Sequence, residues 1–355
     1  MKCLVSDTIE NNHNLFAEIP YRHVYQSYEV LCAAEKAETR AFYFQCLKRP
    51  WNLICKPKFR LYQVWKDDKM VLMAPVRIDG DEANMVGHTC DMNYTDFLYG
   101  DVSDEDLKGA VKCLFGRLKN DGIRSLSCMR LADDSKFLKS IAGCYKVRFD
   151  SKSVCIDLGL EGHEKYFSAL GKHAKQNIRT AYNRLARDNF GFDLLTFSMC
   201  GIGNSMSSQE GQYYIETCKK LYQERQMKRY GMSNGLLMKL LGTKTGGVIL
   251  SNMNYASLSM TSSKSLMTVL LIDGKVGAFM HGFYNEGLKS FEVPKLAMNE
   301  EYSWYSPGLV LVNETAKKFI EDGHIQYIDL TRGTEKYKTD MGGQFYETHA
   351  ITIKL

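Results

Sequence analysis

Residues 266–293, LMTVLLIDGKVGAFMHGFYNEGLKSFEV, contain three runs of β-forming residues that two turn signals separate. The runs are residues 266–272, 276–284 and 288–293, and the turns are Asp273-Gly274 and Asn285-Glu286-Gly287. Asp-Gly and Asn-x-Gly between such runs favour hairpins, because these residues adopt the positive φ that tight turns require. The stretch therefore predicts three consecutive strands that form an antiparallel meander.

The residues after this meander predict a helix over 309–320 and a strand over 325–330. A short helix and a closing strand over 346–354 follow. A meander, one helix and then another strand is an α+β layer arrangement. We therefore expect a mixed, mostly antiparallel sheet that helices flank.

The first half of the chain predicts a similar order of elements. It contains a helix over 28–47, strands over 59–65 and 69–78 around Asp67-Asp68, and an amphipathic helix over 105–119. A strand over 123–131 and a long extended segment over 144–158 follow. The second half begins with helical residues 163–187, a strand over 190–197 and a helix over 210–228. A shorter helix over 236–241 and an irregular stretch over 246–264 come next. Since 355 residues exceed what one core usually serves, we predict two domains, residues 1–150 and 151–355.

The overall composition is that of a globular protein, with 45% apolar and 25% charged residues. A net charge of +5 is too small to indicate nucleic-acid binding by itself. Eleven scattered cysteines without a C-x-x-C pair indicate reduced thiols rather than a disulfide framework or a zinc site. No apolar run approaches the roughly 18 residues of a membrane span, and the N-terminus lacks the apolar core of a signal peptide. We expect a cytoplasmic protein with no membrane span and no metal.

Ser306-Pro307-Gly308 begins the helix that follows the meander. Serine is a favoured N-cap, and proline suits the first helical position. The glycine leaves the free backbone N–H groups accessible, and these donors together with the helix dipole form an anion site. Ser306, Gly308 and Leu309 are therefore candidate contacts to a pyrophosphate, although the same motif also suits a helix start without a ligand.

A basic helix is predicted over residues 171–187, where no acidic residue interrupts the run before Asp188. Its apolar face and its polar face separate cleanly at helical spacing. The cations Lys172, Lys175 and Arg179 share the polar face, which can contact phosphate, an anionic substrate or RNA. A solvated face that pairs with acids elsewhere is the alternative.

Residues 329–338, DLTRGTEKYK, gather polar side chains where a predicted strand leaves its sheet. Such positions are typical of ligand sites in open sheets. Asp329, Arg332, Glu335 and Lys338 are candidate substrate contacts, since Arg332 can bind a carboxylate or phosphate bidentately. Tyr337 is a candidate proton donor. The alternative is a network of these charges that braces the junction between the domains.

Two residues of the meander, His281 and Glu292, are candidate bases. Glu292 lies between Phe291 and Val293 and therefore points to the opposite face of its strand. The chain contains no H-E-x-x-H, P-loop or G-x-S-x-G motif, which disfavours zinc-protease, Walker-type nucleotide and α/β-hydrolase chemistry.

The basic stretch GKHAKQNIRTAYNRL, the Asp-Gly hairpin, YSPGLVL and IDLTRGTEKYK together resemble the GNAT-like acetyltransferases typified by the bacterial cellulose-biosynthesis protein CelD. That group is similar in architecture to the FemABX peptidyltransferases. The resemblance is strongest over residues 150–345. The usual pyrophosphate loop of GNAT proteins, Q/R-x-x-G-x-G/A, is absent; WYSPGL stands in its place.

The resemblance implies a tandem of two GNAT-like domains, with an acyl-CoA site in the second. The pyrophosphate of the donor would contact the backbone at Ser306, Gly308 and Leu309. Attack of an amine on a thioester needs a base and an acid, for which Glu292 or His281 and Tyr337 are the candidates.

Three functions follow as hypotheses from these residues and this resemblance. The first is an N-acyltransferase that moves an acyl group from acyl-CoA to an amine, such as an amino sugar or a precursor of the cell envelope or its polysaccharides. The second is a FemABX-like transferase that uses aminoacyl-tRNA, which the basic helix would suit. The third is a catalytically silent module that binds a partner in polysaccharide synthesis.

Overall fold

The computed structural model describes residues 1–9, 11–17, 28–48, 57–87, 92, 94–159, 161–198, 208–229 and 264–355. The chain forms two compact units. Unit 1 comprises Met1–Ser153, Asn285–Leu288 and Tyr346–Leu355, and unit 2 comprises Val154–Tyr284 and Lys289–Phe345. Unit 1 therefore contains both Met1–Ser153 and Tyr346–Leu355.

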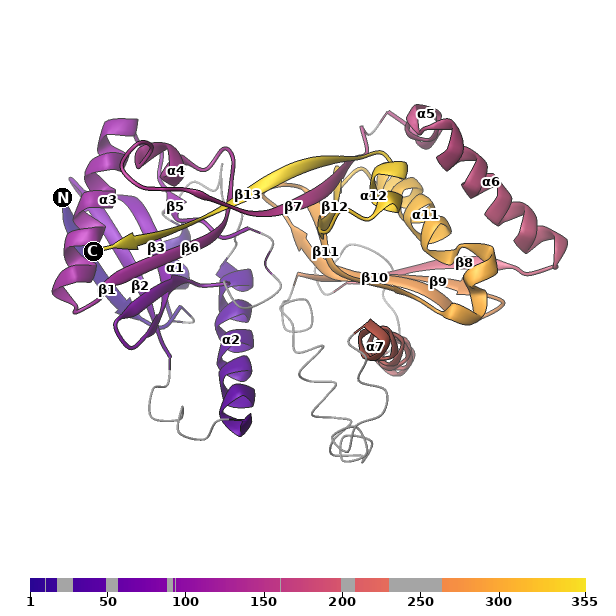
Figure 1. Cartoon of the computed structure of the whole chain (residues 1–355), viewed down its shortest axis with the longest axis horizontal. Helices are drawn as coiled ribbons and strands as arrows, with labels where there is room; N and C mark the ends of the chain where they lie inside the picture. Colours follow the sequence, from indigo (N-terminus) through magenta and orange to yellow (C-terminus); the bar gives the residue numbers. More distant parts are fainter. Residues whose placement is uncertain are drawn as a thin grey trace. The chain divides into compact units, whose positions relative to one another are not determined.

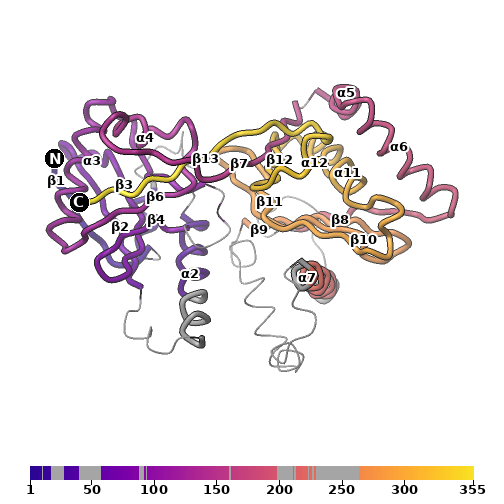
Figure 2. The backbone as a smooth tube through the Cα atoms, in the orientation of Figure 1, coloured from indigo at the N-terminus to yellow at the C-terminus, as the bar shows by residue number. Residues whose placement is uncertain are grey.

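Unit 1 is a mixed sheet with the strand order β1-β2-β3-β4-β6-β13-β7. The strands are β1 (Lys2–Asp7), β2 (Lys58–Lys66), β3 (Lys69–Asp79), β4 (Glu82–Met85), β6 (Ser125–Ala132), β7 (Arg148–Asp157) and β13 (Gly343–Lys354), and the short β5 (Leu98–Tyr99) pairs with β3. β4 and β6 are parallel, whereas β13 lies antiparallel beside β6 (Figure 2). The helices are α1 (His13–Ala17), α2 (Tyr28–Lys48), α3 (Asp104–Asn120) and α4 (Lys136–Ser140).

The amphipathic helix predicted over 105–119 is confirmed as α3, which covers the sheet of unit 1. Its apolar residues recur at helical spacing, so that Leu107, Val111, Leu114 and Leu118 all enter one core with β2, β3, β4 and β6. The helix gives way at Asp121 to Gly122, whose φ of +83° suits a glycine after a helix end.

Unit 2 has the strand order β7-β12-β11-β10-β9-β8. Its strands besides β7 are β8 (Phe192–Ser198), β9 (Ser265–Ile272), β10 (Lys275–Asn285), β11 (Ser290–Met298) and β12 (Tyr327–Arg332). Its helices are α5 (His163–Ala169), α6 (Lys172–Arg187), α7 (Ser208–Arg229), the 3₁₀ helix η2 (Glu300–Tyr305), α11 (Pro307–Asp322) and α12 (Lys336–Asp340). β7 and β13 have residues in both units.

The sheet of unit 2 packs helices on both faces, as Figure 1 shows for α6 and α11 on one side and α7 on the other. Leu270, Met280 and Phe291 enter the larger core with α6 and α11. Their strand neighbours point the other way, so that Val269 and Phe279 pack against the α7 side. This alternation explains why the strands are apolar along most of their length.

The turn signals around the strands predicted the hairpins correctly. Asp67 and Asp68 between β2 and β3 both have positive φ, at +48° and +62°. Asp273 and Gly274 between β9 and β10 have φ of +50° and +72°. Two consecutive residues with positive φ form the turn that matches the twist of paired strands.

Some expectations differ from the structure. The helix predicted over 163–187 is two helices, because Leu170 and Gly171 between α5 and α6 adopt extended backbone with ψ of 151° and 153°. β1 forms within a segment for which the sequence predicted no strand. The helix predicted over 236–241 lies outside the described residues, as does all but the last residue of the irregular stretch predicted over 246–264.

Candidate functional site

Strands β11 and β12 diverge after a short parallel pairing, and this divergence is the basis of the site. They pair at three positions, Ser290 with Tyr327, Phe291 with Ile328, and Glu292 with Asp329. β11 then continues to Met298 and β12 to Arg332 without further pairing between them. The Thr331 hydroxyl donates to the carbonyl of Val293 at 3.2 Å at the point of separation. Backbone groups of β11 beyond Val293 therefore have no partner in β12.

Helix α11 begins beside this divergence with the sequence Ser306-Pro307-Gly308. Ser306 has a φ of +49°, and its side chain makes no capping hydrogen bond. Leu309 and Val310 donate their N–H groups to the carbonyl of Ser306 at 3.0 and 3.3 Å, and Pro307 has no N–H to donate. The first turn contains no acidic residue. The positive end of the helix dipole is therefore neither capped by Ser306 nor neutralised within its own first turn.

A cleft with a volume of about 630 Å³ opens at this helix end. α7, the end of β11, η2, the start of α11 and α12 form its walls. Four residues that the sequence predicted as functional lie in this wall: Ser306, Gly308, Leu309 and Tyr337. A Cβ added at Gly308 would meet no atom within 4 Å, so the glycine leaves space at the helix end.

The wall from α7 contains functional candidates that the sequence prediction missed. Leu221, Glu224, Arg225 and Lys228 line the cleft. These positions follow the spacing i, i+3, i+4 and i+7, which places them on one face of the helix. That spacing is the sequence signal that could have placed these four residues on one helix face. Lys228 forms an ion pair with Glu300 of η2, and the Arg225 guanidinium donates to the carbonyl of Leu296.

Tyr337 is half-buried, lines the cleft and packs against the core of unit 2. Burial is the main cause that raises the pKa of its phenol to about 12. The nearby Glu335 also raises that pKa, whereas Arg225 lowers it. The phenol is therefore neutral at ordinary pH and can donate a hydrogen bond.

Lys338 is buried behind the cleft and bonds to backbone carbonyls. Its ammonium donates to the carbonyls of Leu330 and Arg332 at 2.9 and 2.8 Å, and to those of Thr331 and Gly333 at 3.2 and 3.4 Å. Burial lowers its pKa, and an ion pair with Glu335 at 3.2 Å opposes that effect. Lys338 thus holds the turn that follows β12 after that strand has left β11.

The other residues predicted in the 329–338 segment lie around this turn. Asp329 is buried and accepts the N–H of Thr331 at 2.7 Å. Arg332 is exposed, and the Glu335 carboxylate lies over Gly333. None of Asp329, Arg332, Glu335 and Lys338 is among the cleft-lining residues of the described chain.

The two candidate bases are buried in the sheet of unit 2. Glu292 is 1% exposed and His281 is 3% exposed, and neither lines the cleft. His281 Nε2 lies 3.0 Å from the Ser265 hydroxyl. A Cβ at Gly282 would collide with the Glu292 carbonyl oxygen, so glycine permits the close approach of β10 to β11. Glu292 and Asp329 pair in register, and both contribute, after burial, to the raised pKa of Cys155 on β7.

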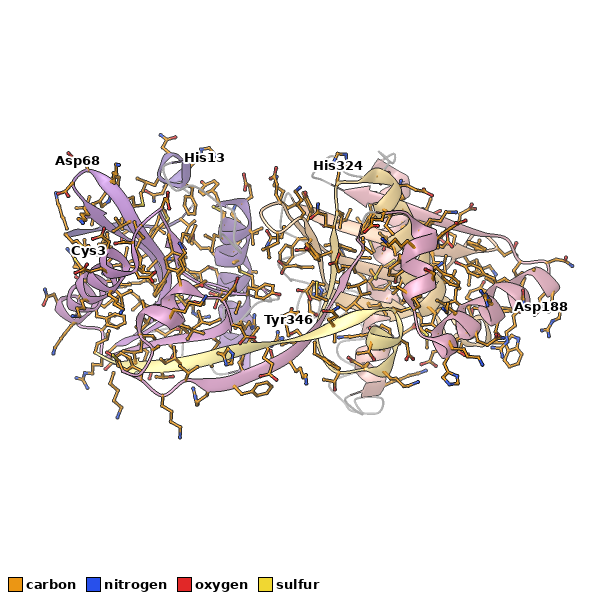
Figure 3. The ribbon with its side chains drawn as sticks, turned by 90° about the horizontal axis from the view of Figure 1, so that it is seen from above. Cys3, His13, Asp68, Asp188, His324 and Tyr346 are labelled. Atoms are coloured by element: carbon orange, nitrogen blue, oxygen red, sulfur yellow. The ribbon has the colours of Figure 1, made fainter. Side chains whose placement is uncertain are left out.

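The cations predicted on the basic helix lie on α6, which contributes no residue to the cleft wall. Lys172 and Arg179 are exposed, and Lys175 donates to the carbonyl of Ser168 at 2.9 Å. Further along α6, Arg184 stacks on Trp304 at 3.7 Å from the ring centre. Asp188, labelled at the end of α6 in Figure 3, accepts the Tyr305 hydroxyl at 2.9 Å. These contacts attach the C-terminal half of α6 to η2.

Within the described ranges, no three His, Cys, Asp or Glu side chains lie close enough together to hold a metal ion. None of the helices in the described part of the chain combines the length and the apolar composition that a membrane crossing requires.

Most of the cleft wall lies in a segment that is similar to a known protein family. Residues 254–339 match the acetyltransferase (GNAT) domain. The match covers the segment from before β9 to α12, including the strand divergence, the start of α11 and Tyr337. No curated protein matched the chain by sequence.

Solved structures show the fold of the whole chain. A conserved protein of unknown function from Bacteroides thetaiotaomicron is 13% identical with a TM-score of 0.54, covering 99% of this chain and 100% of its own. The C-terminal domain of a putative lysylphosphatidylglycerol synthetase from Agrobacterium fabrum is 10% identical, with a TM-score of 0.52 and coverages of 97% and 90%. A tandem GNAT protein from the clavulanic acid biosynthesis pathway is 8% identical, with a TM-score of 0.51 and coverages of 99% and 98%. The predicted α+β tandem GNAT fold is confirmed.

Proposed function

We propose that the protein is an N-acyltransferase that moves an acyl group from acyl-CoA to an amine. The observation that carries the proposal is the cleft at the divergence of β11 and β12, where the open start of α11 and the phenol of Tyr337 line one cavity. An anion site and a proton donor at one cleft suit a donor that has a pyrophosphate at one end and a thioester at the other.

The donor would lie along β11. Its pyrophosphate would accept a hydrogen bond from the N–H of Gly308 at the positive end of α11. Its amide-containing arm would bond to the backbone of β11 beyond Val293, which has no partner in β12. The thioester would then lie toward Tyr337.

In the transfer itself, the amine nitrogen bonds to the thioester carbon, and the carbon–sulfur bond then breaks with its electron pair moving to sulfur. The neutral phenol of Tyr337 donates a hydrogen bond to the leaving sulfur. A base takes the proton of the amine; Glu292 and His281 are our candidates, and both are buried in the sheet from which β11 leads to the cleft.

Titration calorimetry with CoA, acetyl-CoA and longer acyl-CoAs tests the donor. Binding at any chain length supports the proposal, and the absence of binding at every chain length overturns it. Thiol release from the bound donor in the presence of a panel of amines tests the transfer. The resemblance to CelD-type proteins makes amino sugars and envelope precursors the first acceptors to assay.

Tyr337→Phe tests the role of the phenol. We expect kcat to fall about 100-fold, because loss of one general acid costs about that much, while the dissociation constant of the donor stays unchanged. An unchanged kcat would remove Tyr337 from the mechanism.

A FemABX-like transfer from aminoacyl-tRNA is the second candidate, and the exposed cations of α6 favour it. Lys172 and Arg179 are exposed on a helix with no acidic residue before its C-cap, Asp188. This candidate predicts tRNA binding that weakens steeply with salt and on Lys172→Glu or Arg179→Glu. Negligible tRNA binding at low salt would eliminate it.

A further inference from the structure

Arg225 joins two walls of the cleft. Its guanidinium extends from α7 and donates through Nη1 to the carbonyl of Leu296 on β11. Leu296 lies beyond Glu292, the last residue of β11 that pairs with β12. The guanidinium is therefore fixed to the part of β11 that the divergence leaves unpaired by β12.

The same guanidinium acts electrostatically on α12. Its charge lowers the pKa of Tyr337, and Tyr337 and Arg225 line the same cleft. It also contributes to lowering the pKa of Glu335 and of Lys338 on either side of that tyrosine. Two charges act on the phenol: the Glu335 carboxylate disfavours its ionisation, and Arg225 favours it.

Lys228, one turn further along α7, is the natural comparison. It lines the same cleft, but its ammonium forms an ion pair with Glu300 on η2. No effect of Lys228 on the pKa of Tyr337 is resolved. Two cations on one helix face therefore have different surroundings, and Arg225 is the one coupled to the proton donor.

We propose that Arg225 is the positioning residue of the transfer, and that its fixed charge stabilises Tyr337 as the phenol gives its proton to the leaving sulfur. The inference rests on the proposed acyl transfer. As the carbon–sulfur bond breaks, sulfur takes the electron pair and the phenol proton, and the oxygen of Tyr337 gains negative charge. The Arg225 guanidinium lines the same cleft as Tyr337 and donates to the Leu296 carbonyl, so that it can stabilise that charge. Solvent returns a proton to the phenol after the thiol has left.

The test compares two donors that carry the same acyl group on thiols of different acidity. An alkyl thioester, S-acetyl-pantetheine, needs a proton on its leaving sulfur far more than an aryl thioester, S-acetyl-thiophenol, because the aryl thiolate is the more stable anion. We expect Arg225→Gln to lower kcat at least tenfold with the alkyl donor and less than threefold with the aryl donor. Arg225→Lys should recover part of the loss, since it keeps the charge.

Lys228→Gln is the matched control, and we expect it to change the rates with both donors by the same factor. An equal loss with both donors in Arg225→Gln, or a change in KM alone, overturns the role and leaves Arg225 as a structural tie or a binding residue. If Arg225→Gln does not fold, as a thermal melt would show, the same two-donor ratio in Arg225→Lys decides the question. A wild-type protein that transfers from neither donor nor from acetyl-CoA overturns the proposed function, and the inference with it.

Discussion

Both units contain a parallel strand pair that a helix connects and that is paired at three positions. In unit 1 this pair is β4 and β6, which pair from Glu82–Ser125 to Asn84–Ser127, with α3 between them in the chain. In unit 2 it is β11 and β12, with α11 between them. The two pairs have the same connection, but different residues follow them.

In unit 1 the chain after β4 bonds to β6 beyond the paired residues. The buried Arg130 of β6 donates to the carbonyls of Gly87, at 3.0 Å, and Met92. Thr95 donates through its N–H to the carbonyl of Arg130 at 3.2 Å and through its hydroxyl to that of Met129. Arg130 has a φ of +59°, which is uncommon for a residue with a long side chain. We call Arg130, Met92 and residues 94–99 the plug.

The starts of the two connecting helices, α3 and α11, also differ in their caps and in the charge of their first turns. Ser103 caps α3 by accepting the N–H of Asp106, and three acidic residues occupy its first turn. Those carboxylates already interact with the positive end of the helix. α11 has neither feature. The comparison supports our proposal that the acyl donor binds unit 2, where the divergence forms a cleft and the first turn of the helix contains no carboxylate.

The largest effect is expected in the plug, at Asp96. This carboxylate is 4% exposed, and its Oδ2 makes no hydrogen bond, whereas Oδ1 accepts from the N–H of Phe97 and the hydroxyl of Tyr99. Burial is the main cause that raises the pKa of Asp96 from 3.8 to about 7; Asp134 raises it further, and Tyr99 and Ser135 lower it. Protonation is therefore favoured in the folded state.

The contribution of the protonated Asp96 carboxyl to the free energy of unfolding is fully present below pH 4 and is lost as the pH rises toward 7. We expect the free energy of unfolding to fall by about 3 to 4 kcal/mol over that interval, other groups aside. Asp96→Asn should remove this slope in chemical unfolding at several pH values. A variant that keeps the wild-type slope would contradict the assignment.

Lys338→Met should destabilise unit 2, because four backbone carbonyls lose their donor. We expect a loss of about 2 to 3 kcal/mol in the free energy of unfolding, since unsatisfied buried acceptors are costly and the relief of a buried ammonium offsets part of the effect. Lys336→Met is the control: its side chain is 82% exposed, and the change should stay within about 0.5 kcal/mol. Equal losses in the two variants would mean that the turn does not depend on Lys338.

Gly308→Glu gives α11 an acidic first turn like that of α3. We expect about tenfold weaker binding of acetyl-CoA, or roughly 1.4 kcal/mol, because the carboxylate competes with the pyrophosphate for the helix end. Gly308→Gln is the matched control with nearly the same shape and no charge. Calorimetry should show Gln close to the wild type; equal weakening by both variants would indicate a steric effect alone.

Ser103→Ala tests the start of α3. We expect a loss of about 0.5 to 1 kcal/mol in stability, because the side chain caps the Asp106 N–H at 3.2 Å. Ser306→Ala should cost less, since the Ser306 side chain makes no capping bond. Thermal unfolding of the two variants side by side measures the difference. A larger loss at Ser306 would mean that both helices depend on a capped start.

Much of the fold follows from local signals in the sequence. The Asp-Asp and Asp-Gly turns and the apolar spacing of α3 predicted the hairpins and that helix, because φ preferences and helical periodicity act within a few residues. β1 was missed because its stability depends on pairing with β2, more than fifty residues later in the chain. Two extended residues, Leu170 and Gly171, were enough to divide a helix that periodicity alone predicted as continuous.

The candidate site likewise combines residues that local signals predict with residues whose position depends on packing. The helix start at Ser306, Gly308 and Leu309 could be predicted because helix-start signals are local. Arg225 and Lys228 could be placed on one helix face by spacing, but which face borders the cleft depends on how α7 packs. The structural role of Lys338 could not be predicted, because its ammonium bonds to the backbone carbonyls of Leu330 and Arg332. The position of those carbonyls depends on how β12 packs, so the sequence alone does not distinguish Lys338 from a lysine that binds a ligand.

The position of β13 has a consequence for the order in which the chain can fold during synthesis. β13 pairs with β6 from Thr348–Ala132 to Lys354–Ser125, so the sheet of unit 1 includes residues that are translated after unit 2. Nascent unit 1 must therefore wait, with one edge of β6 open, until all of unit 2 has been made. A fragment that stops at Ser153 would expose that edge permanently and should self-associate, because an unpaired strand edge is a template for another chain.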